Sequence, residues 1–380
     1  MRSKFAKWRR TMKVAVKKTD FEFLKVLGEG SFGSVLLARS KWDKKFSAIK
    51  VIKKRDQLSL IINEYRVLRQ ITGHHPFLMS MHCSFQTDES IYMCLDYMVG
   101  GDLFELLNEA GYFNETWARF YAAELVSALT YLHATGFVHR DIKLENLLVD
   151  RDGHVVLTDF NLSRKMTETQ TIIEYGGTPV YMAPEVVLRE PHGFAVDWWG
   201  VGVVLFEMIY GMRPFERKDT NEEQHAIVND QLTLPTRPLR RDRTGRKCES
   251  CVSNAALQLI AALLRKDARE RLTNPNAIKG HPFFAGLSWW QLEQRLLTPP
   301  CQPDPLSFSP YDTESGRSPR SVLGPSEWEA PTSRTVVPQL NFISDQVSKA
   351  IAKYRHRRSS RPTVPLLQKV PFLGRLFCTS

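Results

Sequence analysis

The sequence predicts an α+β protein made of two unequal lobes, a small β-rich lobe followed by a larger helical lobe. Short runs with strand character dominate residues 21–96. The pair Gly100–Gly101 marks a change of character, and segments with helical spacing dominate from Pro184 to Phe284. We expect a hinge near residues 96–101 and a ligand site in the cleft between the two lobes.

The small lobe is predicted to contain four strands and one helix. In chain order, the strands cover Phe21–Gly28, Val35–Arg39, Phe46–Ile52 and Ile91–Tyr97, and the helix covers Leu58–Arg69. In the larger lobe, Trp117–Ala134 has the spacing of a long amphipathic helix. The predicted divisions are a basic arm (residues 1–19), the small lobe (20–98), the larger lobe (99–284) and an extension (285–380).

The composition is that of a globular protein with basic ends. The 380 residues carry a net charge of +11, and the six cysteines are scattered, which favours a reducing compartment. Cys248 and Cys251 form a lone CxxC pair without the second pair that a zinc site needs. The charged N-terminus shows no apolar signal region, so we expect an intracellular, cytoplasmic protein. The basic cluster Lys353–Arg361 also fits a nuclear import signal.

Both ends of the chain differ from the middle. The arm has basic residues around Phe5, Trp8 and Met12, a spacing typical of an amphipathic basic helix. A helix packed on the domain, or a disordered arm, is the simpler interpretation, and contact with an anionic membrane or an acidic partner is the alternative. Residues 299–340 are rich in Pro, Ser and Thr, so we expect an extension that is largely low-complexity or disordered. We expect a monomer without a specific nucleic-acid partner.

A glycine-rich turn joins the first two predicted strands. Its GxGxxGxV pattern consists of Gly28, Glu29, Gly30, Ser31, Phe32, Gly33, Ser34 and Val35. A dinucleotide-binding fingerprint needs a helix after the glycines, whereas strand-like residues follow here. Glycines in a hairpin let main-chain N–H groups approach a phosphate, so the turn is predicted to bind one. An ordinary glycine turn is the alternative.

Lys50 lies in the middle of the third predicted strand, in apolar surroundings. A buried lysine needs a partner, because an unpaired charge in such a site is costly. Glu64, on the following predicted helix, is the candidate partner. The two residues fit the ion pair that places a lysine on nucleotide phosphates, and a surface lysine with an extended stem is the alternative.

A further set of motifs lies in the larger lobe. In chain order it contains His139-Arg140-Asp141, Lys143, Asn146, Asp159-Phe160-Asn161, Gly177-Thr178-Pro179 and Ala183-Pro184-Glu185. With the glycine turn, Lys50 and Glu64, these motifs are similar in order and spacing to those of eukaryotic protein kinases. The resemblance covers residues 20–284. It implies the bilobal protein kinase fold with ATP and Mg²⁺ as cofactors.

The resemblance implies a role for each matched residue. Asp141 resembles the aspartate that orients the substrate hydroxyl and accepts its proton, with Lys50 and Glu64 as the ion pair. Lys143 and Thr178 resemble the γ-phosphate lysine and the supporting threonine of serine/threonine kinases. The implied magnesium ligands are Asn146 and Asp159, and the implied structural residues are Glu185, Asp197 and Arg271.

The hinge, the activation segment and His281–Phe284 resemble the AGC group of kinases, and most of all the ribosomal S-six kinases. By this resemblance, adenine would lie between the apolar side chains of Leu27, Val35, Ala48 and Leu148. Its edge would bond the main chain of Asp96 and Met98, and Asp102 would hold the ribose.

Substrate preference also follows from the resemblance. Asp102, Glu145 and Glu207 fall where arginine-directed relatives place the acids that receive a substrate arginine, so we expect arginine three residues before the target. The segment Arg355–Arg361 fits this preference. Self-phosphorylation there is an alternative to a solvated run of charge.

The sequence departs from the family pattern at Asn161 and Glu174. Asn161 replaces a glycine that adopts positive φ, and asparagine tolerates that backbone best, with strain of about 1–3 kcal/mol. Glu174 replaces a phosphorylated threonine, and a carboxylate is a partial substitute for phosphate. We hypothesise that Glu174 faces Arg140 and orders the activation loop without phosphorylation. A solvated acid on a mobile loop is the alternative.

The connection between Lys50 and Glu64 is short for the AGC group, which puts the docking groove for the C-terminal hydrophobic motif in doubt. The aromatic residues of Phe372–Phe377 are also too far apart for that motif. The sequence as a whole predicts an ATP- and Mg²⁺-dependent serine/threonine kinase that acts on protein substrates by direct in-line transfer. The alternative is a pseudokinase scaffold that binds nucleotide with little or no transfer, which Asn161 motivates.

Overall fold

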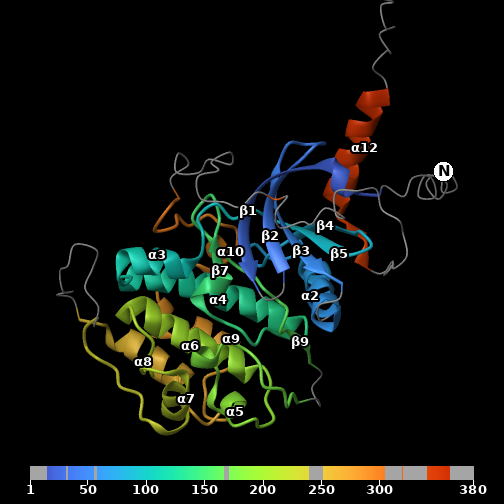
Figure 1. Ribbon diagram of the computed structural model, residues 1–380. Helices are drawn as coiled ribbons and strands as arrows, with labels where there is room; N and C mark the ends of the chain where they lie inside the picture. The colour runs from blue at the N-terminus through green and yellow to red at the C-terminus, as the bar shows by residue number, and fades with distance from the viewer. Residues whose placement is uncertain are drawn as a thin grey trace, which may run out of the picture.

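The computed structural model describes residues 15–30, 33–54, 58–166, 171–238, 251–303 and 340–359, together with Pro319. A β-sheet lobe and a larger helical lobe lie one above the other (Figure 1). The α+β bilobal fold class predicted from the sequence is confirmed. Within the described ranges, no helix combines the length and the apolar content needed to cross a bilayer.

A six-stranded antiparallel sheet forms the small lobe, in the order β1-β2-β3-β5-β4-β10. The strands are β1 (Phe21–Gly30), β2 (Gly33–Ser40), β3 (Phe46–Lys53), β4 (Met81–Gln86), β5 (Ser90–Leu95) and β10 (Phe342–Ile343). Strand β4 was not predicted, although its apolar residues Met81, Cys83 and Phe85 alternate with polar ones, because only Phe85 is of a type enriched in strands. The predicted helix is α2 (Leu58–Ile71), which buries Ile61, Tyr65 and Leu68 against the sheet.

The larger lobe is built around three helices, of which the second packs against both of the others. These are α4 (Glu115–Ala134), α6 (Ala195–Tyr210) and α8 (Asn254–Leu263). The side chain of Asn114 caps α4 by accepting a hydrogen bond from Trp117 N, so the helix begins two residues before the predicted start. The shorter helices are α3 (Leu103–Ala110), α5 (Pro184–Val187), α7 (Thr220–Asn229), α9 (Pro275–Lys279) and α10 (Trp289–Glu293).

Two small two-stranded sheets at the lobe boundary present the loops of the cleft. One pairs β6 (Phe137–Val138) with β9 (Arg164–Lys165), and the other pairs β7 (Leu147–Val149) with β8 (Val155–Leu157). The segment between β6 and β7 contains Asp141, and the segment between β8 and β9 contains Asp159. These pairings bring two loops that are distant in sequence to the same side of the cleft.

The described parts of the extension, residues 285–303 and 340–359, are folded and packed on the rest of the protein. In α10, Leu292 is fully buried, and Ser127 Oγ of α4 donates to Glu293 at 2.7 Å. Farther along, Leu340 is fully buried and its carbonyl accepts a hydrogen bond from Ser84 Oγ at 2.7 Å. Burial of these apolar side chains offsets the entropy cost of ordering the segments.

The last described helix is α12 (Asp345–Ser359), which follows β10 directly. Its residues Val347 and Ile351, one helical turn apart, are buried in a second cluster on the sheet together with Val16 and Phe21. Figure 1 shows α12 beside the strands of the small lobe, with its end projecting away from the larger lobe. Both ends of the described chain therefore contribute to the small lobe.

Candidate active site

Lys50 is the centre of an ion-pair cluster in the cleft. Its Nζ lies 2.8 Å from both carboxylate oxygens of Glu64 and 3.1 Å from Oδ1 of Asp159. Burial lowers the pKa of Lys50, but the two carboxylates outweigh burial and hold the pKa above its usual value. The cluster therefore joins the sheet, α2 and the loop after β8 through one fixed positive charge, in the pairing that the sequence predicted for Lys50 and Glu64.

The backbone of the loop after β8 differs from the expectation for Asn161. A positive φ was expected at Asn161, but the described non-glycine residues with positive φ include Asp159, at 63°, and not Asn161. That expectation is wrong, and any left-handed strain falls on Asp159 instead. Asn161 is only 4% exposed, and its Oδ1 has no hydrogen-bond partner within the described part of the chain.

Asn63, which was not among the predicted site residues, holds the same loop from α2. Its Nδ2 donates to the main-chain carbonyl of Asn161 at 3.3 Å and to that of Ser163 through a short hydrogen bond. Since Asn63 precedes Glu64, two adjacent residues of α2 hold the loop, one directly and one through Lys50. The position beside Glu64 is the only sequence signal that pointed to Asn63.

Asp141 is the meeting point of the predicted catalytic side chains. Its Oδ1 accepts hydrogen bonds from Thr178 N at 2.9 Å and from Thr178 Oγ1 at 2.8 Å. Lys143 Nζ lies 3.1 Å from Asp141 Oδ2 and donates to Thr178 Oγ1 at 2.7 Å. Asn146 Nδ2 donates to the carbonyl of Asp141 at 2.8 Å and to its Oδ2 at 3.1 Å. The Asp141 carboxylate is thereby fixed, with donors on both of its oxygens.

Asp197 of α6 supports this loop from below. Its carboxylate accepts hydrogen bonds from the main-chain N–H groups of His139 at 2.8 Å and Arg140 at 2.7 Å, and it bonds His133 Nε2 at 2.7 Å. Burial raises the pKa of Asp197, but the contact with His133 and the other hydrogen bonds outweigh burial and lower it. These bonds accompany a left-handed φ of 74° at Arg140, next to Asp141.

The glycine turn lies between β1 and β2, as predicted. A side chain at Gly33, where φ is 136°, would collide with the carbonyl oxygen of Val51, so this position needs glycine. Above Gly28 and Gly30 a Cβ atom would meet no other atom within 4 Å. The turn therefore leaves open space over its main chain, which fits a phosphate group.

The residues expected around adenine come from four elements near the hinge. The apolar side chains of Leu27, Val35, Ala48 and Leu148 lie on β1, β2, β3 and β7, and Leu148 forms a bridge with Asp102. None of these four is fully buried, and Leu27 is 37% exposed, as expected for a cleft that is open to a ligand. Met98, at the hinge, packs against the edge of the main core.

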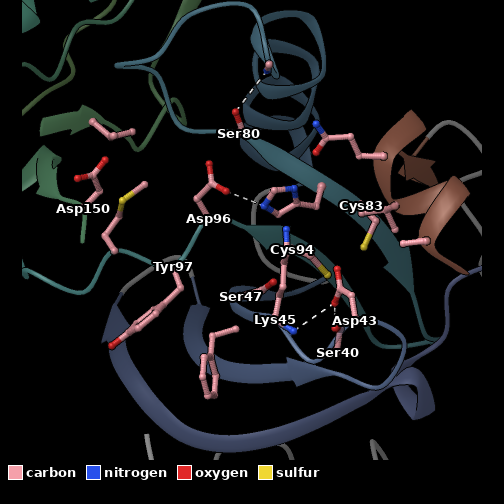
Figure 2. Close-up of a pocket in the computed structure, with 18 of the residues that line it drawn as sticks. Ser40, Asp43, Lys45, Ser47, Ser80, Cys83, Cys94, Asp96, Tyr97 and Asp150 are labelled. Atoms are coloured by element: carbon pink, nitrogen blue, oxygen red, sulfur yellow. Dashed lines mark hydrogen bonds and ion pairs between the residues drawn. The ribbon is translucent and has the colours of Figure 1, made fainter. Parts of the chain in front are cut away.

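A cavity of about 1030 Å³ also adjoins the hinge. Figure 2 shows Asp96 and Tyr97 in this cavity with Asp43, Lys45 and Asp150. The Asp96 carboxylate lies 2.6 Å from His82 Nε2, so its side chain is directed into this cavity. Lys50, Asp141 and Asp159 do not line the cavity, which is therefore separate from the catalytic cluster.

Glu174 lies where the sequence hypothesis placed it, beside Arg140. Its Oε2 is 3.0 Å from Arg140 Nη1 and 2.8 Å from Arg164 Nη2, and its carbonyl accepts from Arg140 Nη2 at 2.7 Å. Burial raises the pKa of Glu174, but the charge of Arg164 and the contact with Arg140 outweigh burial and hold this pKa below its usual value. A carboxylate at this position therefore links the activation segment to the catalytic loop.

The three acids expected to receive a substrate arginine differ in their surroundings. Asp102 caps α3 by accepting from Glu105 N at 2.8 Å, which engages one of its carboxylate oxygens. Glu207 is only 3% exposed and accepts a hydrogen bond of 2.5 Å from the hydroxyl of Tyr181. Burial raises the pKa of Glu207 to about 7. Glu145 has a buried Oε2 without a hydrogen-bond partner in the described ranges.

Glu185 and Arg271 form the structural ion pair that the resemblance implied. Arg271 Nη1 and Nη2 lie 2.7 and 2.9 Å from the two carboxylate oxygens of Glu185, in a bidentate arrangement. Arg271 also donates to the carbonyl of Ala195 at the start of α6. The end of the activation segment is thereby attached to the core of the larger lobe.

Asn146 and Asp159 fit a magnesium site by the chemistry of their donors. Asn146 uses its N–H₂ group on Asp141, which leaves its amide oxygen as a ligand, and Asp159 uses Oδ1 on Lys50, which leaves Oδ2. Mg²⁺ prefers oxygen ligands and is usually held by one or two side chains together with nucleotide phosphates and water. Among the described residues, no cluster of three His, Cys, Asp or Glu side chains could hold a metal alone.

Some of the sequence predictions lie outside the described residues. They concern Ser31 and Phe32 of the glycine turn, the basic arm over residues 1–14, Cys248, Ser360 and Phe372–Phe377. Cys251, the second member of the CxxC pair, is exposed and unoxidised.

The comparisons with known proteins agree with this geometry. A family model described as the protein kinase domain matches residues 21–284. The chain is 43% identical over 310 residues to the serine/threonine-protein kinase Sgk1 of Danio rerio, covering 78% of this chain and 68% of that protein. It is 42% identical over 328 residues to Sgk1 of Xenopus tropicalis and of Homo sapiens, covering 81% of this chain and 75% and 73% of those proteins. The chain therefore belongs to the protein kinase family, as a serine/threonine kinase of its AGC group.

Proposed function

We propose that this kinase uses ATP and Mg²⁺ to phosphorylate serine or threonine in protein substrates that carry an arginine upstream of the target. The observation that carries the proposal is the arrangement around Asp141, whose carboxylate is held in place by contacts with Thr178 and Lys143. Lys50 and Asp159, which also belong to the cleft, are joined by an ion pair of 3.1 Å. Such a set supplies a proton acceptor, fixed cations and metal ligands for phosphoryl transfer.

In this proposal each side chain has a positional or acid–base task. The Asp141 carboxylate orients the substrate hydroxyl and takes its proton as the oxygen attacks in line, without a phosphoenzyme. Lys143 neutralises charge on the transferred group, and Lys50, held by Glu64, positions the inner phosphates. The bound nucleotide and its magnesium ion would supply the phosphoryl group and part of the charge neutralisation.

The proposed preference for arginine rests on Glu207 and Glu145. Both carboxylates are near Tyr181. Burial raises the pKa of the Tyr181 hydroxyl, and the charges of the two carboxylates raise it further. Glu145 Oε2 has no hydrogen-bond partner in the described ranges, and the pKa of Glu207 is raised by burial to about 7. The guanidinium group of a substrate arginine would donate a hydrogen bond to Glu145 Oε2, because it carries five donors. Its permanent positive charge would also stabilise the ionised form of the buried Glu207. Asp102 keeps one carboxylate oxygen for a second contact.

The cellular setting of the kinase is also part of the proposal. We infer an intracellular, monomeric enzyme in the cytoplasm and the nucleus, because the cysteines are scattered and the ends of the chain are basic. Contact of the basic arm with an anionic membrane or an acidic protein is kept as a proposal on the same grounds. No observation favours the pseudokinase alternative, since Lys50, Glu64, Asp141, Asn146 and Asp159 are all present.

The test is a transfer assay with the full-length chain, labelled ATP and Mg²⁺. Two peptides are compared, one with arginine three residues before serine and one with alanine there. We expect transfer to the first, weaker transfer to the second, and loss of about three orders of magnitude or more in Asp141→Asn. Equal transfer to both peptides contradicts the arginine preference. No transfer by wild type, with a melting temperature that ATP still raises, contradicts the catalytic proposal.

A further inference from the structure

The two ends of the described chain meet on one face of the small lobe. Val16 and Phe21, close to the start, are buried in one cluster with Val347 and Ile351 of α12. The turn between β2 and β3 joins them, because Lys41 Nζ donates to the carbonyl of Thr19 at 2.7 Å. Figure 1 shows this face on the side of the small lobe that is remote from α5, α7 and α8.

The positive charge of the chain is concentrated in the same two segments. Residues 1–20 carry eight basic and one acidic side chain, and residues 340–361 carry six basic and one acidic. The summed net charge of these two segments is slightly greater than the net charge of +11 of the whole chain, so the rest of the protein is close to neutral. The fold brings their described ends onto one surface, although more than 300 residues separate them in sequence.

The described basic side chains of this surface come from three elements, and we call them the lysine face. Its members are Lys17, Lys18, Lys41, Lys44, Lys45, Lys349 and Lys353. All except Lys18, which is half-buried, are exposed. The turn and α12 adjoin each other, since Lys45 and Lys349 line the same cavity. The acids of these segments are Asp20, Asp43 and Asp345, so the face is net positive.

We propose that the lysine face docks this kinase on a bilayer that contains acidic phospholipids. A lysine near such a surface strengthens binding by about fivefold, and lipids diffuse to meet charges that have no fixed geometry. Arginine is the residue that recognises phosphate groups in a fixed bidentate geometry, whereas the seven members of the lysine face are all lysines and the arginines of α12 lie near its end, from Arg355 on. Delocalised attraction by lysines therefore fits a fluid anionic surface.

Nucleic acid fits the lysine face less well. Single-stranded nucleic acid is usually bound by exposed aromatic side chains that stack on bases. The large apolar side chains that are exposed in the described ranges are Leu27, Ile173, Tyr175, Leu188, Trp290 and Leu296, and none belongs to this face. The sequence preceding Ala15 places Phe5, Trp8 and Met12 among basic residues, which is the pattern of segments that bind a membrane interface.

Docking by this face leaves the cleft accessible. Lys50 and Asp141 lie between the lobes, whereas the lysine face lies on the outer side of the sheet, with α12 projecting away from the larger lobe (Figure 1). The inference does not depend on the transfer chemistry, and it can be tested on the protein without a substrate.

The experiment measures binding of the full-length chain to vesicles of phosphatidylcholine, alone or with about one third phosphatidylserine, at roughly 0.1 M salt. The variant Lys44→Gln/Lys349→Gln/Lys353→Gln removes three charges from the face. The matched control, Lys165→Gln/Lys218→Gln/Arg237→Gln, removes three charges from exposed positions elsewhere. A third variant with arginine at the three positions of the lysine face keeps the charge and shows whether the side chains act through it.

We expect binding only to vesicles with phosphatidylserine, and weaker binding at high salt. The face variant should bind about a hundredfold more weakly, while the control and the arginine variant stay within about threefold of wild type. Unchanged melting temperature shows that the face variant is folded. Equal binding to both vesicle types, equal losses in face variant and control, or full binding by the face variant overturns the proposal. So does stronger binding to duplex DNA or RNA than to the anionic vesicles, with the same dependence on the three lysines.

Discussion

The side chain of Asn63 donates a hydrogen bond of 3.3 Å to the main-chain carbonyl of Asn161, and this bond joins α2 to the loop that carries Asp159. A second, short bond from the same amide reaches the carbonyl of Ser163. Glu64, the next residue, holds the loop through Lys50. The position of α2 and the position of the Asp159 carboxylate are therefore coupled by two neighbouring side chains.

Replacing Asn63 with alanine should loosen the loop without removing a predicted ligand. Two hydrogen bonds of about 1 kcal/mol each are lost, so the half-saturating Mg²⁺ concentration should rise by roughly threefold to thirtyfold. The measurement is initial rate against Mg²⁺ at fixed ATP. Gln70→Ala, at an exposed position of the same helix, is the control and should match wild type. An unchanged Mg²⁺ dependence in Asn63→Ala would show that the amide does not position the loop.

Replacing Asn161 with glycine should change little. Asn161 is not in the left-handed region, so glycine relieves no backbone strain there. Removing a buried amide oxygen that has no partner in the described ranges stabilises the loop by about 1 kcal/mol. The greater backbone freedom of glycine destabilises it by about the same amount. We expect kcat within about threefold of wild type. A rise in kcat of two orders of magnitude would instead identify Asn161 as a brake on transfer.

Replacing Glu174 with glutamine should weaken the link between the activation segment and Arg140 while keeping its size. The variant should lose about tenfold in kcat, because a charge-assisted contact becomes a neutral one. The pKa of Glu174 is lowered, so its contribution is present above the unfolded pKa and is lost only as the pH falls through the folded one. The reference is the unphosphorylated wild-type protein, assayed at neutral pH. Equal kcat in both proteins refutes the link.

The stability of the larger lobe should depend on pH through Glu207. Its folded pKa is raised to about 7, above the ordinary value of 4.5, so its stabilising contribution is complete below pH 4.5 and is lost as the pH rises to about 7. The expected loss is roughly 2–4 kcal/mol between these limits. Denaturant unfolding of wild type and Glu207→Gln at several pH values measures it. The variant should show a flatter profile, and parallel profiles would exclude Glu207 as the source.

A substrate arginine should act on the same group in the opposite direction. A guanidinium beside Glu207 favours its ionised form, so binding of an arginine peptide should release a proton and strengthen as the pH rises from about 5 to about 7. Peptide affinity measured by calorimetry in two buffers with different ionisation enthalpies reports the proton. In Glu207→Gln the pH dependence should disappear, which a contact elsewhere on the protein would not explain.

Replacing Leu340 with alanine should detach the segment that forms β10. Leu340 is fully buried, and its removal costs about 2–4 kcal/mol of docking free energy. Hydrogen exchange of residues 340–351 should become faster while exchange in α4 stays slow. Gln346→Ala, at an exposed position of α12, is the control. If exchange in 340–351 does not change, the segment is held by contacts other than Leu340.

Local motifs were readable from the sequence because their spacing reflects local geometry. The glycine turn, the strand with Lys50 and the helix with Glu64 follow from residues close together in the chain. Strand β4 was missed although its residues alternate between apolar and polar, because Met, His, Cys, Ser and Gln have little preference for strands. Asn63 was missed because an amide on a helix has no spacing rule, and its partners lie almost a hundred residues away.

The order and chemistry of the kinase motifs, and the charge at both ends, were determined by the amino-acid sequence alone. Only the tertiary structure decided that the left-handed backbone lies at Asp159, that Glu174 joins Arg140 to Arg164, and that α12 shares a cluster with Val16. The physical reason is that sequence patterns record which face of an element is apolar. Which distant element covers that face depends on packing and burial, and no pattern within a single segment carries that information.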